Sequence, residues 1–93
     1  MKVRILKEEI KELNRVVDEF AVAMKEKLAE KARDGWCGWD DLEDGTELTR
    51  IKEKLGERVV WLLIGDDKQA VNVANFAMMI WYNDKEEQPV AED

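Results

Sequence analysis

Apolar residues recur at steps of three and four along the first third of the chain, which is the spacing of one face of an α-helix. The pattern predicts a helix over residues 3–32, with Glu, Lys and Arg on the side opposite the apolar stripe. The stripe consists of Ile10, Leu13, Val17, Phe20, Met24 and Leu28. Gly35 is expected to end this helix, because Gly is the usual residue just beyond a helix terminus.

A second helical pattern begins at Asp44 or Thr46, either of which can cap a helix, and continues to about Ile64, before Gly65. Its inward positions are Leu48, Ile51, Leu55, Val59 and Leu62, and its other sides carry Val60, Trp61, Leu63 and Ile64. A third helix, capped by Asp66 or Asp67, is predicted to end near Tyr82. Residues 1–84 then form a single domain, and the charged tail of residues 85–93 is expected to be disordered.

The third helix carries no charge from Val71 to Trp81, and its polar side chains there are Asn72 and Asn75. A helix that is apolar nearly all round needs cover on every side, and two partner helices cover only part of it. Met78 and Met79 are therefore expected in the core. The sequence predicts an all-α fold of three main helices, a bundle completed by a symmetric homodimer or higher homo-oligomer through the second and third helices.

Composition excludes several classes of function. The chain has 93 residues and a net charge of −7, which argues against non-specific binding to nucleic acid. It has no His and no Ser, and Cys37 is the lone cysteine, so a His/Cys zinc site and a Ser–His or Cys–His nucleophile are excluded within one chain. The first ten residues lack the apolar run of a signal peptide, and no segment approaches the ~20 apolar residues of a membrane span. We therefore expect a cytoplasmic protein with no membrane partner.

Two polar groups on the predicted helices have both a structural and a functional interpretation. Asn72 and Asn75 stand three residues apart, so they are either buried amides bonded across helices or the floor of a polar site. Glu8, Glu9 and Glu12 form an E-E-x-x-E pattern. Carboxylates at this spacing could chelate Mg²⁺, but a solvated helix face is the simpler interpretation in a sequence with this much Glu.

The loop after the first helix combines Gly with aromatic and acidic residues, in the order Trp36, Trp39, Asp40 and Asp41. Trp supplies a flat surface on which a nucleotide base can stack, and Gly lets a ligand approach the backbone closely. In the alternative interpretation, both Trp side chains close the open end of the helical bundle.

Two stretches of the sequence resemble a known family. KEKLAEKARDGWCGWDD, residues 25–41, and KLGERVVWLLIGDDKQAVNVANFAMMIWYND, residues 54–84, resemble the all-α nucleoside triphosphate pyrophosphohydrolases, the MazG-like proteins, in their short phage and prokaryotic form. The most specific piece is VANFAMMI, residues 73–80. The resemblance implies a helical bundle that converts a nucleoside triphosphate to monophosphate and pyrophosphate, with carboxylates holding Mg²⁺ against the phosphates.

The family's carboxylate motifs are only partly present in this chain. Its E-x-x-D falls on Gln69 and Asn72, so both acids have become amides, and its E-E-x-x-E falls on residues 56–60, where Glu57 is the acid left to hold a metal. The family-equivalent candidate positions are thus Glu57, Gln69, Asn72 and Asn75. The resemblance then implies a catalytically impaired protein with a nucleotide-binding or interaction role. The alternative is an active Mg²⁺-dependent pyrophosphohydrolase with an atypical site.

Overall fold

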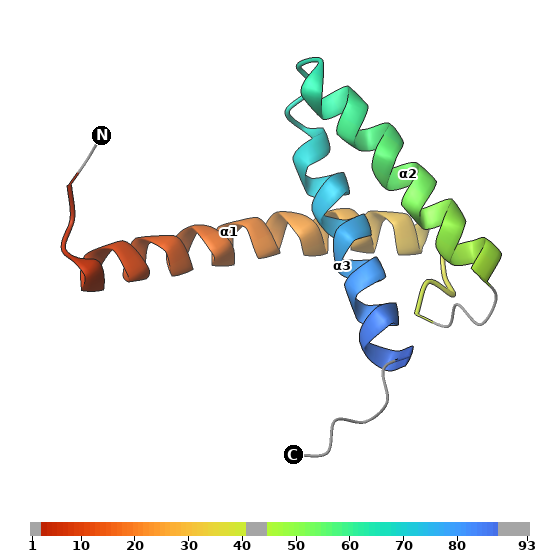
Figure 1. Cartoon of the computed structure of the whole chain (residues 1–93), viewed down its shortest axis with the longest axis horizontal. Coiled ribbons are helices and arrows are strands. Elements are labelled where there is room, and N and C mark those ends of the chain that lie inside the picture. The colour runs from red at the N-terminus through yellow and green to blue at the C-terminus, as the bar shows by residue number, and fades with distance from the viewer. Residues whose placement is uncertain (1–2, 41–44, 88–93) are drawn as a thin grey trace.

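The structure, a computed structural model, describes residues 3–40 and 45–87 of the chain (Figure 1). This part is all-α and contains three helices and no strand: α1 is Leu6–Arg33, α2 is Gly45–Leu63 and α3 is Gln69–Glu87. The predicted fold class and the number of helices are confirmed. α3 continues past the predicted end near Tyr82, and residues 88–93 of the predicted tail lie outside the described residues.

α1 and α2 end in the same way, at the two glycines that the sequence singled out. Gly35 and Gly65 adopt positive φ angles of 93° and 115°. Beyond each glycine, a backbone N–H reaches back five residues, from Trp36 to the Lys31 carbonyl at 3.1 Å and from Asp66 to the Trp61 carbonyl at 3.0 Å. This is the Schellman arrangement, in which a left-handed residue satisfies the last carbonyls of a helix. The predicted helix ends at Gly35 and Gly65 are therefore confirmed.

α2 and α3 form a helical hairpin, and α3 also crosses α1, so that α3 is the central helix (Figure 1). Among the described residues α1 and α2 do not contact each other. The buried core consists of Ile51, Phe76 and Met79, and Met79 has 0% of its surface exposed. Side chains packed around them include Leu28, Trp36, Trp39, Leu55, Met78 and Ile80. The predicted place of Met79 in the core is confirmed, and Met78 is partly buried.

The apolar stripe of α1 lies against the rest of the chain only in its second half. α1 crosses α3 near Met24, which leaves its first half extending into solvent (Figure 1). We call residues 6–20 the projecting half of α1 and residues 21–33 its packed half. Four members of the stripe, Ile10, Leu13, Val17 and Phe20, are exposed. The rest of the single chain leaves these four residues uncovered, because α1 extends beyond the α2–α3 hairpin (Figure 1).

Candidate functional site

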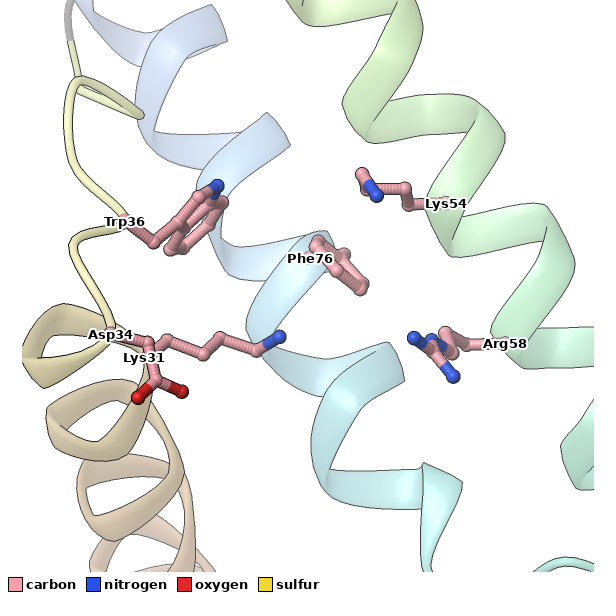
Figure 2. A pocket seen from close by; sticks show the side chains of 6 residues that line it. All are labelled: Lys31, Asp34, Trp36, Lys54, Arg58 and Phe76. Carbon is pink, nitrogen blue, oxygen red and sulfur yellow. The ribbon is translucent and has the colours of Figure 1, made fainter.

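A pocket of about 240 Å³ opens where the end of α1 faces α2 across α3. Its walls come from every helix and from the loop after α1 (Figure 2). The lining residues are Lys31, Asp34, Trp36, Lys54, Arg58 and Phe76. Three of the six are cations and two are aromatic, in a chain whose net charge is −7. The described lining of the pocket is thus mainly positive, whereas the protein as a whole is negative.

The Schellman turn at the end of α1 builds one wall of the pocket. It brings Trp36 back beside Lys31, and the Trp36 ring meets the edge of Phe76 at a centroid distance of 6.5 Å. The Nζ of Lys31 lies 5.7 Å from the Trp36 centroid and 5.6 Å from that of Phe76, within the range of a cation–π contact. The aromatic wall therefore holds the Lys31 ammonium at the edge of the cavity.

α2 supplies the opposite wall. Lys54 and Arg58 are four residues apart and so lie on one face of this helix. Figure 2 shows the Arg58 guanidinium and the Lys31 ammonium directed toward each other across the pocket, with the Asp34 carboxylate turned away from the space between them. Like charges at this spacing destabilise a helix slightly, so the pair is not explained by helix stability.

The three cations of the pocket have no anionic partner among the described residues, where every ion pair within 4 Å involves other side chains. Burial lowers the pKa of Lys31 below its usual value, and the neighbouring charges of Lys27, Arg58 and Lys54 lower it further. Both causes disfavour the charged ammonium. The pocket is therefore a concentration of positive charge that the described part of the chain leaves unneutralised.

A second hollow of about 310 Å³ adjoins the first and shares Trp36 and Lys54 with it. Its other lining residues are Cys37, Gly38, Trp39, Glu47, Arg50 and Ile51. Within the second hollow, Arg50 is paired with Glu47 at 3.1 Å. Lys54 lines both hollows and has no anionic partner among the described residues. The two hollows are neighbours with Trp36 and Lys54 in common, each has two aromatic side chains in its lining, and the first has the larger number of unpaired cations among the described residues.

The two Trp of the loop agree with both of their interpretations. Each is half-buried and packs on α3, Trp36 against Phe76 and Trp39 against Tyr82 with a centroid distance of 5.4 Å. They close the end of the bundle and also line the hollows. Asp40 is exposed and lines neither hollow, and Asp41 lies outside the described residues.

The three candidate amides of α3, Gln69, Asn72 and Asn75, do not form a single site. Gln69 Nε2 donates to the Asp66 carboxylate at 3.0 Å, and Asn72 Nδ2 donates to the Gln69 side-chain oxygen at 2.8 Å, within one turn of the same helix. Asn75, with 1% of its surface exposed, donates from Nδ2 to the Met24 carbonyl of α1 at 3.4 Å. Asn75 therefore bridges two helices, as the structural interpretation requires, whereas Asn72 does not.

The acids of the chain are not gathered for a metal ion in the described residues, where no three of Cys, Asp and Glu come together. Glu57 is exposed on α2. On α1, Glu9 pairs with Arg4 at 2.8 Å and Glu12 accepts a bond from Arg15 at 3.1 Å. Mg²⁺ needs oxygen ligands in near-octahedral order, so the side chains that the structure describes do not fit a Mg²⁺ site.

Sequence reasoning missed the residues that define this site. Lys31, Lys54 and Arg58 were part of the charged helix faces, and Asn83 was unremarked. Asn83, 5% exposed, donates to the Trp39 carbonyl at 2.9 Å and so ties the loop to α3. The like-charged spacing of Lys54 and Arg58 was a weak signal, which the many other charges of the helices obscured.

Comparisons with protein-family models, curated proteins and solved structures find no match to this chain. The likeness to the MazG-like family consequently rests on the two stretches of sequence already quoted. No helix in residues 3–40 or 45–87 is long and apolar enough to cross a membrane.

Proposed function

We propose that this chain is a MazG-like all-α protein that binds a nucleotide and does not hydrolyse it. One observation carries the proposal: the pocket between α1 and α2 presents Lys31, Lys54 and Arg58 without anionic partners among the described residues, next to two aromatic rings. A nucleotide offers the matching chemistry, with phosphate oxygens for the cations and a flat base for the rings.

The size of the site fits a ligand that occupies both hollows. Small-molecule sites usually have about 300–1,000 Å³, so the 240 Å³ pocket alone accommodates a phosphate group better than a whole nucleotide. The adjoining hollow, with Trp36 and Trp39 in its wall, is the place for the base. Lys54 lies between the two and can contact either part of the ligand.

The lack of hydrolysis follows from the positions that would hold the metal. Gln69 and Asn72 are amides bonded to each other, and Glu57 is a lone exposed acid. Amide oxygens contribute no negative charge, so these residues are poor replacements for the carboxylates that position Mg²⁺ on a triphosphate. We therefore expect nucleotide binding with little or no release of pyrophosphate.

The protein is further proposed to be a homodimer. Its apolar surface is larger than the sequence suggested: beside Val60, Trp61, Leu63 and Ile64 at the end of α2, the whole stripe of the projecting half of α1 is exposed. Contiguous apolar patches of this kind generally mark an interface. A second copy of the chain that covers the projecting half would complete the bundle.

Calorimetric titration with a panel of ribo- and deoxyribonucleoside triphosphates tests the proposal, together with an assay for pyrophosphate release in Mg²⁺ and Mn²⁺. We expect saturable binding and no turnover. Turnover near 1 s⁻¹, in the ordinary range of enzymes, that disappears in Glu57→Gln would establish the active pyrophosphohydrolase instead. Absence of binding to every nucleotide in the panel would refute the nucleotide-binding role.

A further inference from the structure

We infer that the pocket holds the phosphate of its ligand directly, as a free anion, with Lys31, Lys54 and Arg58 in the place that a metal ion would take. This inference rests on the proposed function, because it concerns the same site. It adds the form in which the ligand is recognised: a phosphate or pyrophosphate group that is not complexed with Mg²⁺.

The convergence of the three cations is the first argument. They come from the end of α1 and from one face of α2, and their charged groups approach the cavity from opposite sides (Figure 2). Burial lowers the pKa of Lys31, and the nearby positive charges of Lys27, Arg58 and Lys54 lower it further by repulsion. A bound anion removes this repulsion and adds charge-assisted hydrogen bonds to all three.

The composition of the walls is the second argument. Asp34 is the sole carboxylate among the described residues that line the pocket, and it points away from the cations (Figure 2). A Mg²⁺–phosphate complex would carry less negative charge and would place a divalent cation beside Lys31 and Arg58. A free phosphate group avoids that repulsion, and the planar guanidinium of Arg58 can bind two of its oxygens at once.

The recessed form of the site favours a small ligand over a nucleic-acid backbone. The three cations face one cavity of about 240 Å³ and do not form a stripe along the surface. The net charge of −7 also opposes the approach of a polyanion, whose binding depends on a positive field along its length.

The test compares two titrations of the full chain, one with inorganic pyrophosphate and one with ATP, each in EDTA and again in excess Mg²⁺. We expect both probes to bind in EDTA and to bind more weakly in Mg²⁺, because the metal competes with the protein for the phosphate oxygens. Binding of either probe that requires Mg²⁺ would overturn the inference and leave nucleotide binding in place. Absence of binding in both conditions by ATP and by every other nucleotide of the panel would refute the proposed function itself. A single-stranded oligonucleotide that bound more tightly than ATP would also overturn the inference.

Two variants locate the site. Lys54→Gln and Arg58→Gln should each weaken pyrophosphate binding in EDTA by roughly ten- to a hundredfold, the value of one hydrogen bond to a charged group. Lys52→Gln is the matched control, because Lys52 is exposed on α2 and lines neither hollow. Each variant should keep its helices, since Lys, Arg and Gln have similar helix propensities. Circular dichroism checks the helical content of each variant. Unchanged binding in both folded variants, or an equal loss in Lys52→Gln, would place the anion elsewhere and overturn the inference.

Discussion

The two halves of α1 carry the same amphipathic pattern and have different surroundings. In the packed half, Met24 and Leu28 are half-buried against α3. In the projecting half, Leu13 and Val17 remain 56% and 63% exposed, although they continue the same stripe. A hydrophobic stripe therefore predicts which face of a helix is suited to burial, but it does not identify the surface that buries this face, in the same chain or in another.

The two halves of α1 also differ in the kind of side chain that the chain leaves without a partner surface or counter-ion. The projecting half exposes apolar side chains, whose burial by a second copy would be driven by the hydrophobic effect. Near the end of the packed half, Lys31 has no anionic partner among the described residues, and a small anion is the ligand that matches its charge. α1 thus carries the proposed assembly surface in its first half and part of the proposed binding site near its end.

The largest expected effect distinguishes the core from the projecting half. Met79→Ala should lower the free energy of unfolding by about 2–5 kcal/mol, because it opens a cavity at a side chain with 0% exposure. Leu13→Ala, measured at a concentration where the protein is monomeric, should change it by no more than about 0.5 kcal/mol. Urea unfolding measures both. An equal loss for the two variants would mean that the projecting half is packed within one chain.

The second prediction concerns assembly. Leu13→Asp should weaken self-association by roughly a hundredfold or more, because an interface would have to bury an unpaired carboxylate. Analytical ultracentrifugation over a dilution series measures the change. Lys11→Asp is the control, since residue 11 lies on the charged side of the predicted stripe. A stable monomer of the unmodified protein at micromolar concentration would contradict the predicted dimer.

The third prediction tests what holds the packed end together. Asn83 donates to the Trp39 carbonyl at 2.9 Å and to that of Met79 at 2.7 Å, so Asn83→Ala should destabilise the protein by about 1–2 kcal/mol. It should also increase proteolysis of the loop that contains Trp39. Asn72→Ala is the matched control, because the bond of Asn72 stays within its own helix and Ala favours the helix. A loss in Asn72→Ala as large as that in Asn83→Ala would contradict this assignment.

The smallest expected effect is a stabilisation. The pKa of Lys31 is lowered in the folded protein from its usual 10.5, so the ammonium is less favourable in the folded chain than in the unfolded one. Lys31→Met keeps the apolar stem and removes this charge. It should stabilise the unliganded protein at neutral pH by at most about 0.5 kcal/mol, because Lys31 is only partly buried and solvent still screens its charge. The same substitution should abolish most of the pyrophosphate binding.

The pH dependence of the Lys31 effect has a definite sign. In the interval between the lowered pKa and 10.5 the unfolded chain holds more protons, so the contribution of Lys31 to stability rises with pH there. The charged groups beside Lys31 are Lys27 and Glu30 on α1 and Lys54 and Arg58 on α2. The difference between Lys31→Met and the unmodified protein should therefore shrink as the pH rises toward 10.5. Thermal melts across this range, with Lys52→Met as control, measure it, and a growing difference would contradict the assignment.

Local features of the fold followed well from the sequence. The glycines that end α1 and α2, the all-α class and the inward face of α2 at Ile51 are set by neighbouring residues, and periodicity records them. The exposure of Val60 and Trp61 also agrees with their place outside the inward face.

The site did not follow, because its residues are brought together by packing. Lys31 and Arg58 are distant in the chain, and nothing local marks either one among so many charged residues. Their charges become informative only when the crossing of α3 over α1 places them at one cavity. Likewise the apolar stripe showed which face of α1 is suited to burial, but it did not show at which residue α3 crosses α1.

The length of α1 beyond its crossing has a consequence for exchange kinetics. The packed half is fixed against α3 and can serve as the nucleus from which the projecting half continues as helix, since extending a helix is easier than starting one. Neither α2 nor α3 lies beside the first half of α1 (Figure 1). In a monomer, backbone amides should therefore exchange with solvent ever faster from the crossing at Met24 toward Leu6, as the free end frays. Covering the stripe with a second copy would reduce this difference in exchange rate along the helix. The exchange rate of each amide would then show which residues of α1 the second copy covers.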